Sequence, residues 1–180
     1  MTPDGEIKIV FSGTMGSGKT TAIANISDVP PVSTEALTTD EGAAGKTSTT
    51  AAMDYGEVDL GDDLVLRLYG TPGQRRFRHM WELLVPGALG VVILVDNARP
   101  LPLSDVAIYL DNFAGLVGPS GVVIGITKTD MAPEPSIAEY HQFLAERNES
   151  YTVLAVDVRK RDDVLMMIDV LLTSVEGALQ

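Results

Sequence analysis

The sequence predicts a three-layer α/β/α fold, in which helices cover both faces of a six-stranded, mostly parallel sheet with one antiparallel edge strand. Short β-rich runs alternate with helical periodicity along the chain. Val91–Val95 is apolar at every position, as in a strand covered on both sides. An acidic turn at residues 61–63 joins two strands too closely for any but an antiparallel pair. The length of 180 residues fits one domain over residues 1–180.

The first half of the chain contains three predicted strands and one helix. Ile7–Phe11 is the first strand, and a glycine-rich loop follows it before a helix that begins near Lys19. Residues 28–50 are rich in Pro, Gly, Ser and Thr and lack apolar periodicity, which predicts a long surface loop. Met53–Val58 and Leu64–Leu68 then form the predicted hairpin.

The second half alternates regularly after the buried strand. Leu103–Val117 is predicted as a helix, Val122–Ile126 as a strand and Ile137–Arg147 as a helix. The last strand is Val153–Val156, and the last helix is Asp162–Val175. Sheets of this kind bind their ligands at the carboxyl ends of the strands, so the loops there are the candidate site.

Charge and composition exclude several classes of partner. Twenty-five acidic and 13 basic residues give a net charge of −12, which disfavours nucleic acid and anionic lipid surfaces. The absence of cysteine excludes disulfides, palmitoylation and prenylation, and Thr2 excludes myristoylation. The start, MTPDGEIKIV, lacks the features of a signal peptide. We therefore expect a cytoplasmic protein without a direct membrane anchor.

The stretch GTMGSGKT, which begins at Gly13, matches the phosphate-binding pattern G-x-x-x-x-G-K-[ST] between a predicted strand and a predicted helix. Its glycines let consecutive amides point at phosphate oxygens, and the helix N-terminus adds to that field. Lys19 supplies a positive charge for the β- and γ-phosphates, and the Thr20 hydroxyl is a hard ligand suited to Mg²⁺. The residues predicted to bind the nucleotide here are Gly13, Met15, Gly16, Ser17, Gly18, Lys19, Thr20 and Thr21.

Four further loops complete a recognisable set: TAAMDY from Thr50, GTPGQ from Gly70, TKTD from Thr127 and VDVR from Val156. With these loops the chain resembles the Ras-like small GTPases along nearly its full length. It looks closest to the bacterial branch that includes the Mgl-type polarity GTPases and the conservon-type GTPases. The resemblance implies a P-loop GTPase domain.

The first two of these loops resemble the switch loops of that family. By resemblance, Thr50 coordinates Mg²⁺ together with Thr20 and senses the γ-phosphate, although Thr47 and Thr49 compete for this role. Gly73 offers its amide to the γ-phosphate, because glycine permits close approach of the backbone. Gln74 orients the attacking water as the glutamine of the family does. The predicted catalytic residues are therefore Gln74, Lys19 and Thr50.

The last two loops are similar to the base-binding loops of the family. Asp130 would accept hydrogen bonds from guanine, whose donors adenine lacks, and Lys128 would lie along the base plane. Thr127 stands where the family has asparagine and has a shorter reach. In the final loop, Asp157 and the backbone of Val158 are predicted to touch the base.

Two departures from the family pattern affect the metal and the rate. Gly70 stands where the family usually has an aspartate that contacts Mg²⁺ through water, which predicts a weaker metal site that still functions. Met15 replaces the glycine beside the γ-phosphate, and Thr49 replaces the arginine of the Mgl-type proteins. Three arginines follow Gln74, and we interpret them as a partner surface. The expected hydrolysis is slow without an activating partner.

These features predict a Mg²⁺- and GTP-dependent molecular switch that signals to a protein partner. By resemblance, that partner is a roadblock/LC7-type dimer. Two alternatives remain open: a nucleotide-binding module with negligible turnover, and a P-loop small-molecule kinase. The kinase would use Asp96, at the end of a strand, as a metal-holding carboxylate, but Ras-like proteins commonly have an aspartate there without that role.

Overall fold

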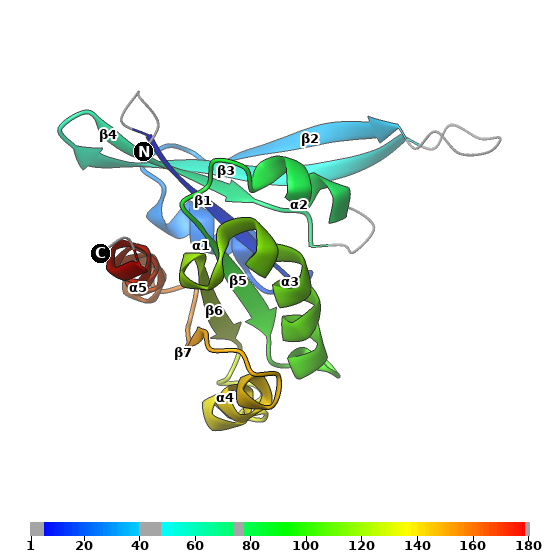
Figure 1. The fold of residues 1–180 in the computed structure, drawn as a ribbon. Helices are drawn as coiled ribbons and strands as arrows, with labels where there is room; N and C mark the ends of the chain where they lie inside the picture. Colours follow the sequence, from blue (N-terminus) through cyan, green and yellow to red (C-terminus); the bar gives the residue numbers. More distant parts are fainter. Residues whose placement is uncertain (1–5, 40–47, 74–77, 179–180) are drawn as a thin grey trace.

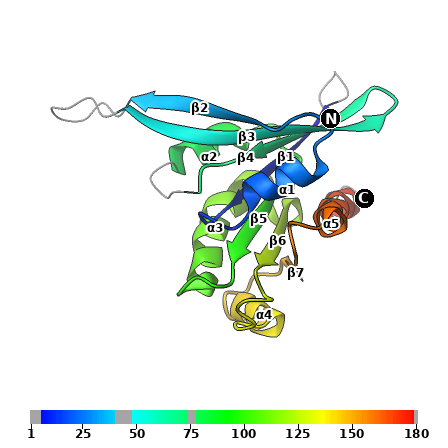
Figure 2. The same ribbon diagram turned by 180° about the vertical axis from the view of Figure 1, so that it is seen from behind.

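The structure is a computed structural model that describes residues 6–39, 48–73 and 78–178. Within these ranges, a seven-stranded sheet in the order β2-β3-β4-β1-β5-β6-β7 lies between two layers of helices (Figures 1 and 2). The strands are β1 (Glu6–Gly13), β2 (Val32–Thr39), β3 (Ser48–Gly61), β4 (Leu64–Gly70), β5 (Gly90–Asp96), β6 (Val122–Thr127) and β7 (Thr152–Ala155). The helices are α1 (Lys19–Ile26), α2 (Arg78–Leu84), α3 (Pro102–Val117), α4 (Ile137–Glu146) and α5 (Arg161–Ala178).

The predicted fold class is confirmed. β1, β4, β5, β6 and β7 run parallel to one another, while β3 pairs antiparallel with β4. The buried strand β5 has no exposed residue along its length, in agreement with its continuous apolar run. The carboxyl ends of the parallel strands therefore meet at one edge of the sheet, as the sequence predicts.

The sheet differs from the prediction at its outer edge. Val32–Thr39 is a strand, and not part of a loop, because it pairs with β3 through eight residues. β3 begins at Ser48, ahead of the predicted start at Met53, and lies second from the edge with β2 outside it. Figure 1 shows this end of the hairpin projecting beyond the helices. Because no helix packs on it there, its residues need no alternating apolar pattern, and the sequence gives no strand signal. Residues 32–39 include three threonines, and threonine suits extended backbone without such a pattern.

Two apolar clusters attach the helices to the sheet. α1 and α5 cover one face, with Ile23 and Met167 among the residues of that cluster. α2, α3 and α4 cover the other face. There Trp81 of α2 stacks on Tyr109 and Phe113 of α3, with ring centroids 5.0 and 5.1 Å apart. Its indole N–H is buried and has no hydrogen-bond partner among the described residues.

Candidate functional site

The phosphate cradle is the turn between β1 and α1. The Thr14 amide donates to the Leu94 carbonyl at 3.2 Å, and the Ser17 amide donates to the Thr14 carbonyl at 3.1 Å. Gly13 has a φ of +138°, and a Cβ there would lie 1.9 Å from the Leu94 oxygen. Only glycine fits this position, so the first glycine of the motif is required by the approach of β5.

Lys19 is buried at the base of the cradle. Its ammonium donates to the carbonyls of Gly13 at 2.9 Å and of Thr14 at 2.8 Å. Burial lowers the pKa of Lys19 to about 8, and the negative charge of Asp54 opposes that shift. The buried Ser17 hydroxyl has no hydrogen-bond partner among the described residues. A buried positive charge and an unsatisfied hydroxyl together favour an anionic ligand here.

An acidic side chain does stand beside the cradle, but it comes from β3. The Thr20 hydroxyl donates to the Asp54 carboxylate at 2.6 Å, and Asp54 is 9% exposed. Asp54 pairs across the ladder with Gly70, and a Cβ on Gly70 would lie 3.0 Å from the Asp54 Cβ. The space left by the missing aspartate is thus occupied by Asp54. Its signal in the sequence was an acidic residue on the same strand face as buried Val58.

Thr50 does not lie beside Thr20 in this structure. Its backbone pairs with Leu37 in the β2–β3 ladder, so its predicted position in a loop is wrong. It is four residues from Asp54 along the same strand, about 13 Å at the usual rise of an extended chain. A role for Thr50 at the phosphates therefore requires the hairpin to rearrange.

Gly73 approaches the cradle closely. A Cβ at this position would lie 2.8 Å from the Met15 backbone and 2.9 Å from the Lys19 ammonium. The structure therefore places the Gly73 backbone against the cradle, and its contact with a γ-phosphate stays a prediction. The Met15 side chain is 63% exposed and leaves the cradle toward solvent. Gln74 lies outside the described residues, and its role stays a prediction.

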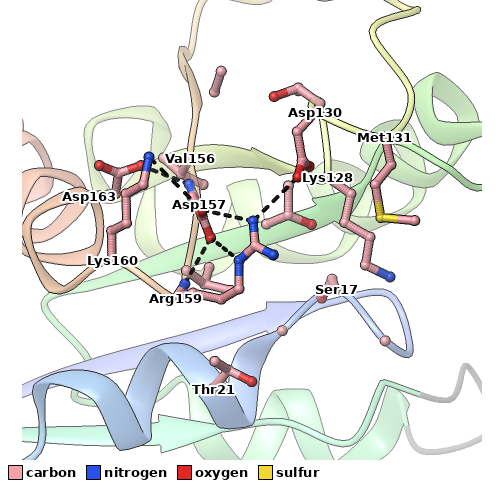
Figure 3. A pocket seen from close by; sticks show the side chains of 16 residues that line it. Ser17, Thr21, Lys128, Asp130, Met131, Val156, Asp157, Arg159, Lys160 and Asp163 are labelled. Carbon is pink, nitrogen blue, oxygen red and sulfur yellow. Dashed lines mark hydrogen bonds and ion pairs between the residues drawn. The ribbon is translucent and has the colours of Figure 1, made fainter.

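A pocket of about 420 Å³ adjoins the cradle (Figure 3). Its walls are formed by residues 16–18 of the cradle, by 127–131 at and beyond the end of β6, and by 155–160 at and beyond the end of β7. Thr21 and Asp163 complete it. It brings together all the residues predicted to contact the base. Three of the sequence motifs, the cradle and the loops that begin at Thr127 and Val156, therefore converge on one cavity.

The start of the loop after β6 is held by contacts with the end of β5. Lys128 has a φ of +61°, and its ammonium lies 2.5 Å from the Asp96 carboxylate. Asp96 also accepts the Ala98 amide at 2.9 Å, which supports its interpretation as a structural aspartate. The buried Thr127 hydroxyl donates to the Val95 carbonyl at 3.2 Å, so its one donor is used within the sheet. Thr127 also lines the pocket, and its contact with a base stays a prediction.

A buried asparagine after β5 also holds the segment that follows β6. The Asn97 amide group donates to the carbonyls of Ala132 at 2.7 Å and Pro135 at 3.1 Å. Its oxygen accepts the Tyr140 hydroxyl at 2.7 Å. Asn97 is 2% exposed and uses both ends of its side chain, so β5, the base loop and α4 are joined by one residue. Sequence reasoning missed Asn97, since its role depends on contacts with carbonyls.

The final loop contributes in two ways. Val158 is buried, and its side chain would lie 2.6 Å from a Cβ on Gly18, so it packs on the cradle. Asp157 lines the pocket, and a hydrogen bond from Arg159 lowers the pKa of this carboxyl to about 2. Asp157 is therefore ionised at neutral pH.

Two other features are absent from the described residues. No group of three or more His, Asp or Glu side chains there converges to hold a metal ion. No helix in the described part of the chain has the length and apolar character needed to cross a membrane.

Relatives of the chain are found among Ras-related proteins and archaeal proteins. An uncharacterized protein of Methanocaldococcus jannaschii is 31% identical over 101 residues, which cover 56% of this chain and 57% of that protein. Ras-related protein RABA6b of Arabidopsis thaliana is 28% identical over 87 residues, 47% of this chain and 38% of that protein. The chain thus spans less than two thirds of these two relatives. Ras-related protein RabC of Dictyostelium discoideum is 21% identical, covering 96% of this chain and 85% of that protein.

The fold comparison agrees with these relatives. The Arl6 small GTPase of Trypanosoma brucei, solved with the nucleotide analogue GppNp, superposes with a TM-score of 0.66 at 19% identity. The match covers 96% of this chain and 98% of that chain. A family profile described as conserved hypothetical ATP binding protein matches residues 11–172. The chain has the Ras- and Arl-like small-GTPase fold and belongs to the family described as conserved hypothetical ATP binding protein.

Proposed function

We propose that this protein is a Mg²⁺-dependent, GTP-binding switch that hydrolyses GTP slowly. One relationship carries the proposal: a phosphate cradle with a buried lysine shares a wall with a pocket that contains Lys128 and Asp130. A nucleotide bound with its phosphates on the cradle has its base within reach of this pocket. Small-GTPase folds bind nucleotides in this manner at the carboxyl ends of the strands.

The phosphates would be bound by backbone amides and by Lys19. In the structure, the Lys19 ammonium is paired with two carbonyl oxygens, which are weaker partners than phosphate. Phosphate binding would replace those partners, hold Lys19 in its charged form and give the Ser17 hydroxyl an acceptor. In a chain with a net charge of −12, this local positive field is needed to attract an anion.

The donor set fits a magnesium ion. The Thr20 hydroxyl and the Asp54 carboxylate are hard oxygen groups within hydrogen-bond distance of each other, beside the cradle. Thr20 and Asp54 would hold Mg²⁺ together with phosphate oxygens and water, and the ion would neutralise phosphate charge when bound. Asp54 thereby supplies the acidic group that Gly70 cannot.

Recognition of guanine would come from Asp130. Guanine presents N1–H and a 2-amino group, a donor pair that suits a carboxylate, whereas adenine would leave Asp130 without those bonds. The stem of Lys128, fixed by its ion pair with Asp96, would lie along the base. Because Thr127 donates to the sheet, it offers less to the base than an asparagine would.

Hydrolysis would proceed by attack of water on the γ-phosphorus. The water oxygen bonds to phosphorus, the bond to the β–γ bridging oxygen breaks, and GDP leaves with that oxygen, while a water proton passes to phosphate. We propose Gln74 as the residue that orients this water, and the Gly73 amide as a donor to the γ-phosphate. The proximity of Gly73 to Lys19 supports the second assignment.

Signalling would depend on segments that respond to the γ-phosphate. Thr50 and Gly73 would both be held by GTP and released on hydrolysis. Thr50 now lies in the β2–β3 ladder, which supports a rearrangement of this hairpin between the two states. A roadblock/LC7-type dimer as the partner, and membership of the bacterial Mgl- and conservon-type branch, are supported by the resemblance of the motifs alone.

ATP binding is the second candidate, and the description of the family favours it. Titration of GDP, GTP and ADP, each with Mg²⁺ and with EDTA, separates the two. We expect guanine nucleotides to bind more tightly than ADP. Equal or tighter binding of ADP would overturn the assignment of Asp130.

A variant pair tests the cradle in the same experiment. Lys19→Ala should lose most of its affinity for GDP, about 100-fold for a hydrogen bond between charged groups. Lys8→Ala removes an equal charge from β1, the strand that precedes the cradle, where the Lys8 ammonium donates to the Pro86 carbonyl, and this variant should bind GDP as wild type does. Wild-type affinity in Lys19→Ala would refute nucleotide binding at the cradle.

A further inference from the structure

Two acidic residues in the base pocket are joined by one arginine. Arg159 donates to both oxygens of Asp157, from Nε at 2.7 Å and from Nη2 at 2.9 Å. Nη2 also donates to Asp130 Oδ2 at 3.3 Å. Figure 3 shows Arg159 between the loops that follow β6 and β7, with its guanidinium directed at both carboxylates.

Asp130 needs such a partner to be positioned. Its side chain is 59% exposed at the rim of the pocket, so it has rotamer freedom that burial does not remove. Asp157 is only 24% exposed and holds the planar guanidinium in a two-bond fork, which fixes the direction of the third bond. Arg159 thereby links the Asp130 carboxylate, in the loop after β6, to the better ordered loop after β7.

This contact is compatible with base binding. A carboxylate offers about four acceptor sites, and Arg159 uses one of them on Asp130. Capacity therefore remains for the N1–H and the 2-amino group of guanine. Asp163 also lines the pocket and accepts the Asp157 amide at 2.8 Å, so three carboxylates surround this space. The charge of Arg159 reduces the repulsion that they would exert on one another and on an anionic nucleotide.

We infer that Arg159, held by Asp157, is a positioning residue that aims the Asp130 carboxylate at the guanine edge and so sets selectivity for the 2-amino group. The inference rests on the proposed function, since it assumes that a guanine nucleotide occupies the pocket. Arg159 acts through Asp130 in this arrangement. Its effect is therefore on discrimination between bases more than on phosphate binding.

The test measures the dissociation constants of GDP, IDP and ADP for wild type, Arg159→Ala, Arg159→Lys and Arg161→Ala. Inosine lacks the 2-amino group, so the ratio of the IDP and GDP constants reports the contact made by Asp130. Arg161 contacts the Asn25 carbonyl outside the pocket, and its variant removes an equal charge. Thermal unfolding of each variant checks that all four proteins fold alike.

In Arg159→Ala we expect the GDP constant to rise about three- to fivefold, near the upper limit for an exposed ion pair. The IDP constant should rise less, so the ratio falls. Arg159→Lys keeps the charge but not the fork, and its ratio should also fall. Arg161→Ala should keep the wild-type ratio.

Two results would refute the role of Arg159 while leaving guanine binding intact. One is an unchanged ratio in Arg159→Ala, and the other is tighter binding of GDP, which would make Arg159 a competitor of the base. If wild type binds ADP as tightly as GDP, the proposed function fails and this inference fails with it.

Discussion

The Thr20 hydroxyl donates a 2.6 Å hydrogen bond to the Asp54 carboxylate, so the acidic group beside the phosphate cradle belongs to β3. The neighbouring strand β4 ends at Gly70, which pairs with Asp54 and leaves room for its side chain. One strand has thus supplied the group that its neighbour lacks.

Asp54→Asn should weaken binding of GDP in the presence of Mg²⁺ by about 10–100-fold, the usual effect of losing a group that supports a bound metal. The loss should disappear in EDTA, because the amide is neutral and similar in shape. Asp59→Asn provides a matched control at an exposed position near the other end of the same strand. Isothermal titration with and without Mg²⁺ measures both. An equal loss in EDTA would mean that Asp54 does not act through a metal.

An exchange of the two paired residues should restore the site. Gly70→Asp alone should destabilise the protein, since its Cβ would lie 3.0 Å from the Asp54 Cβ and place two carboxylates together. With Asp54→Gly added, the nearest remaining obstacle is the Ile23 Cδ1 atom, the flexible end of a side chain. The double variant should recover Mg²⁺-dependent GDP affinity relative to Asp54→Gly. No recovery would show that the position on β4 cannot reach the metal.

The β2–β3 hairpin should change when a GTP analogue binds. If Thr50 moves to the γ-phosphate, the ladder that pairs it with Leu37 must open or shift. Amide hydrogen exchange in residues 32–39 should then differ between the GDP and GTP-analogue states, while β5 stays protected in both. Identical exchange in the two states would argue against Thr50 as the sensor.

Turnover should be slow without a partner, on the order of 10⁻⁴ s⁻¹. Slow turnover is typical of this fold when no arginine reaches the γ-phosphate, and the candidates Arg75 and Arg76 lie outside the described residues. A single-turnover assay with excess protein measures the rate, and Gln74→Ala should reduce it further. A partner-free rate near 1 s⁻¹ is incompatible with this expectation. Unchanged turnover in Gln74→Ala would instead remove Gln74 from the mechanism.

Tyr140 should make the protein less stable at high pH. Burial raises the pKa of Tyr140, and the negative charges of Asp105 and Asp96 raise it further. Above the unfolded pKa of about 10, the unfolded chain loses this proton while the folded chain keeps it, so stability falls as pH rises. Tyr140→Phe cannot ionise, so its urea midpoint should fall less than that of wild type between pH 8 and 10.8. At pH 8 it should be less stable than wild type, because Asn97 loses a partner.

The sequence predicted the parts of the site that backbone geometry dictates. The spacing of the cradle glycines reflects the contact between Gly13 and Leu94, and the loops that follow β6 and β7 are located by their strands. Thr50 was predicted in a loop because residues 32–39 show no apolar periodicity. These residues form a strand through their backbone pairing with β3, which the apolar pattern does not reveal.

Individual side-chain roles were harder to predict. Asp54 gains its role only beside Gly70, a cross-strand neighbour that register alone determines. Thr127 lines the pocket as expected, but the motif does not reveal that its hydroxyl donates to the Val95 carbonyl within the sheet. Arg159 connects two aspartates from separate loops, a relationship that no single motif contains.

Trp81 is the only tryptophan of the chain. It lies on α2, eight residues after Gly73, and stacks on two rings of α3. Its emission therefore reports on a single contact between these helices. Any nucleotide-dependent displacement of α2 would move the indole toward water and shift its fluorescence to longer wavelengths. The protein thus carries an intrinsic optical probe, and the kinetics of its response to nucleotide can be followed in stopped flow without a label.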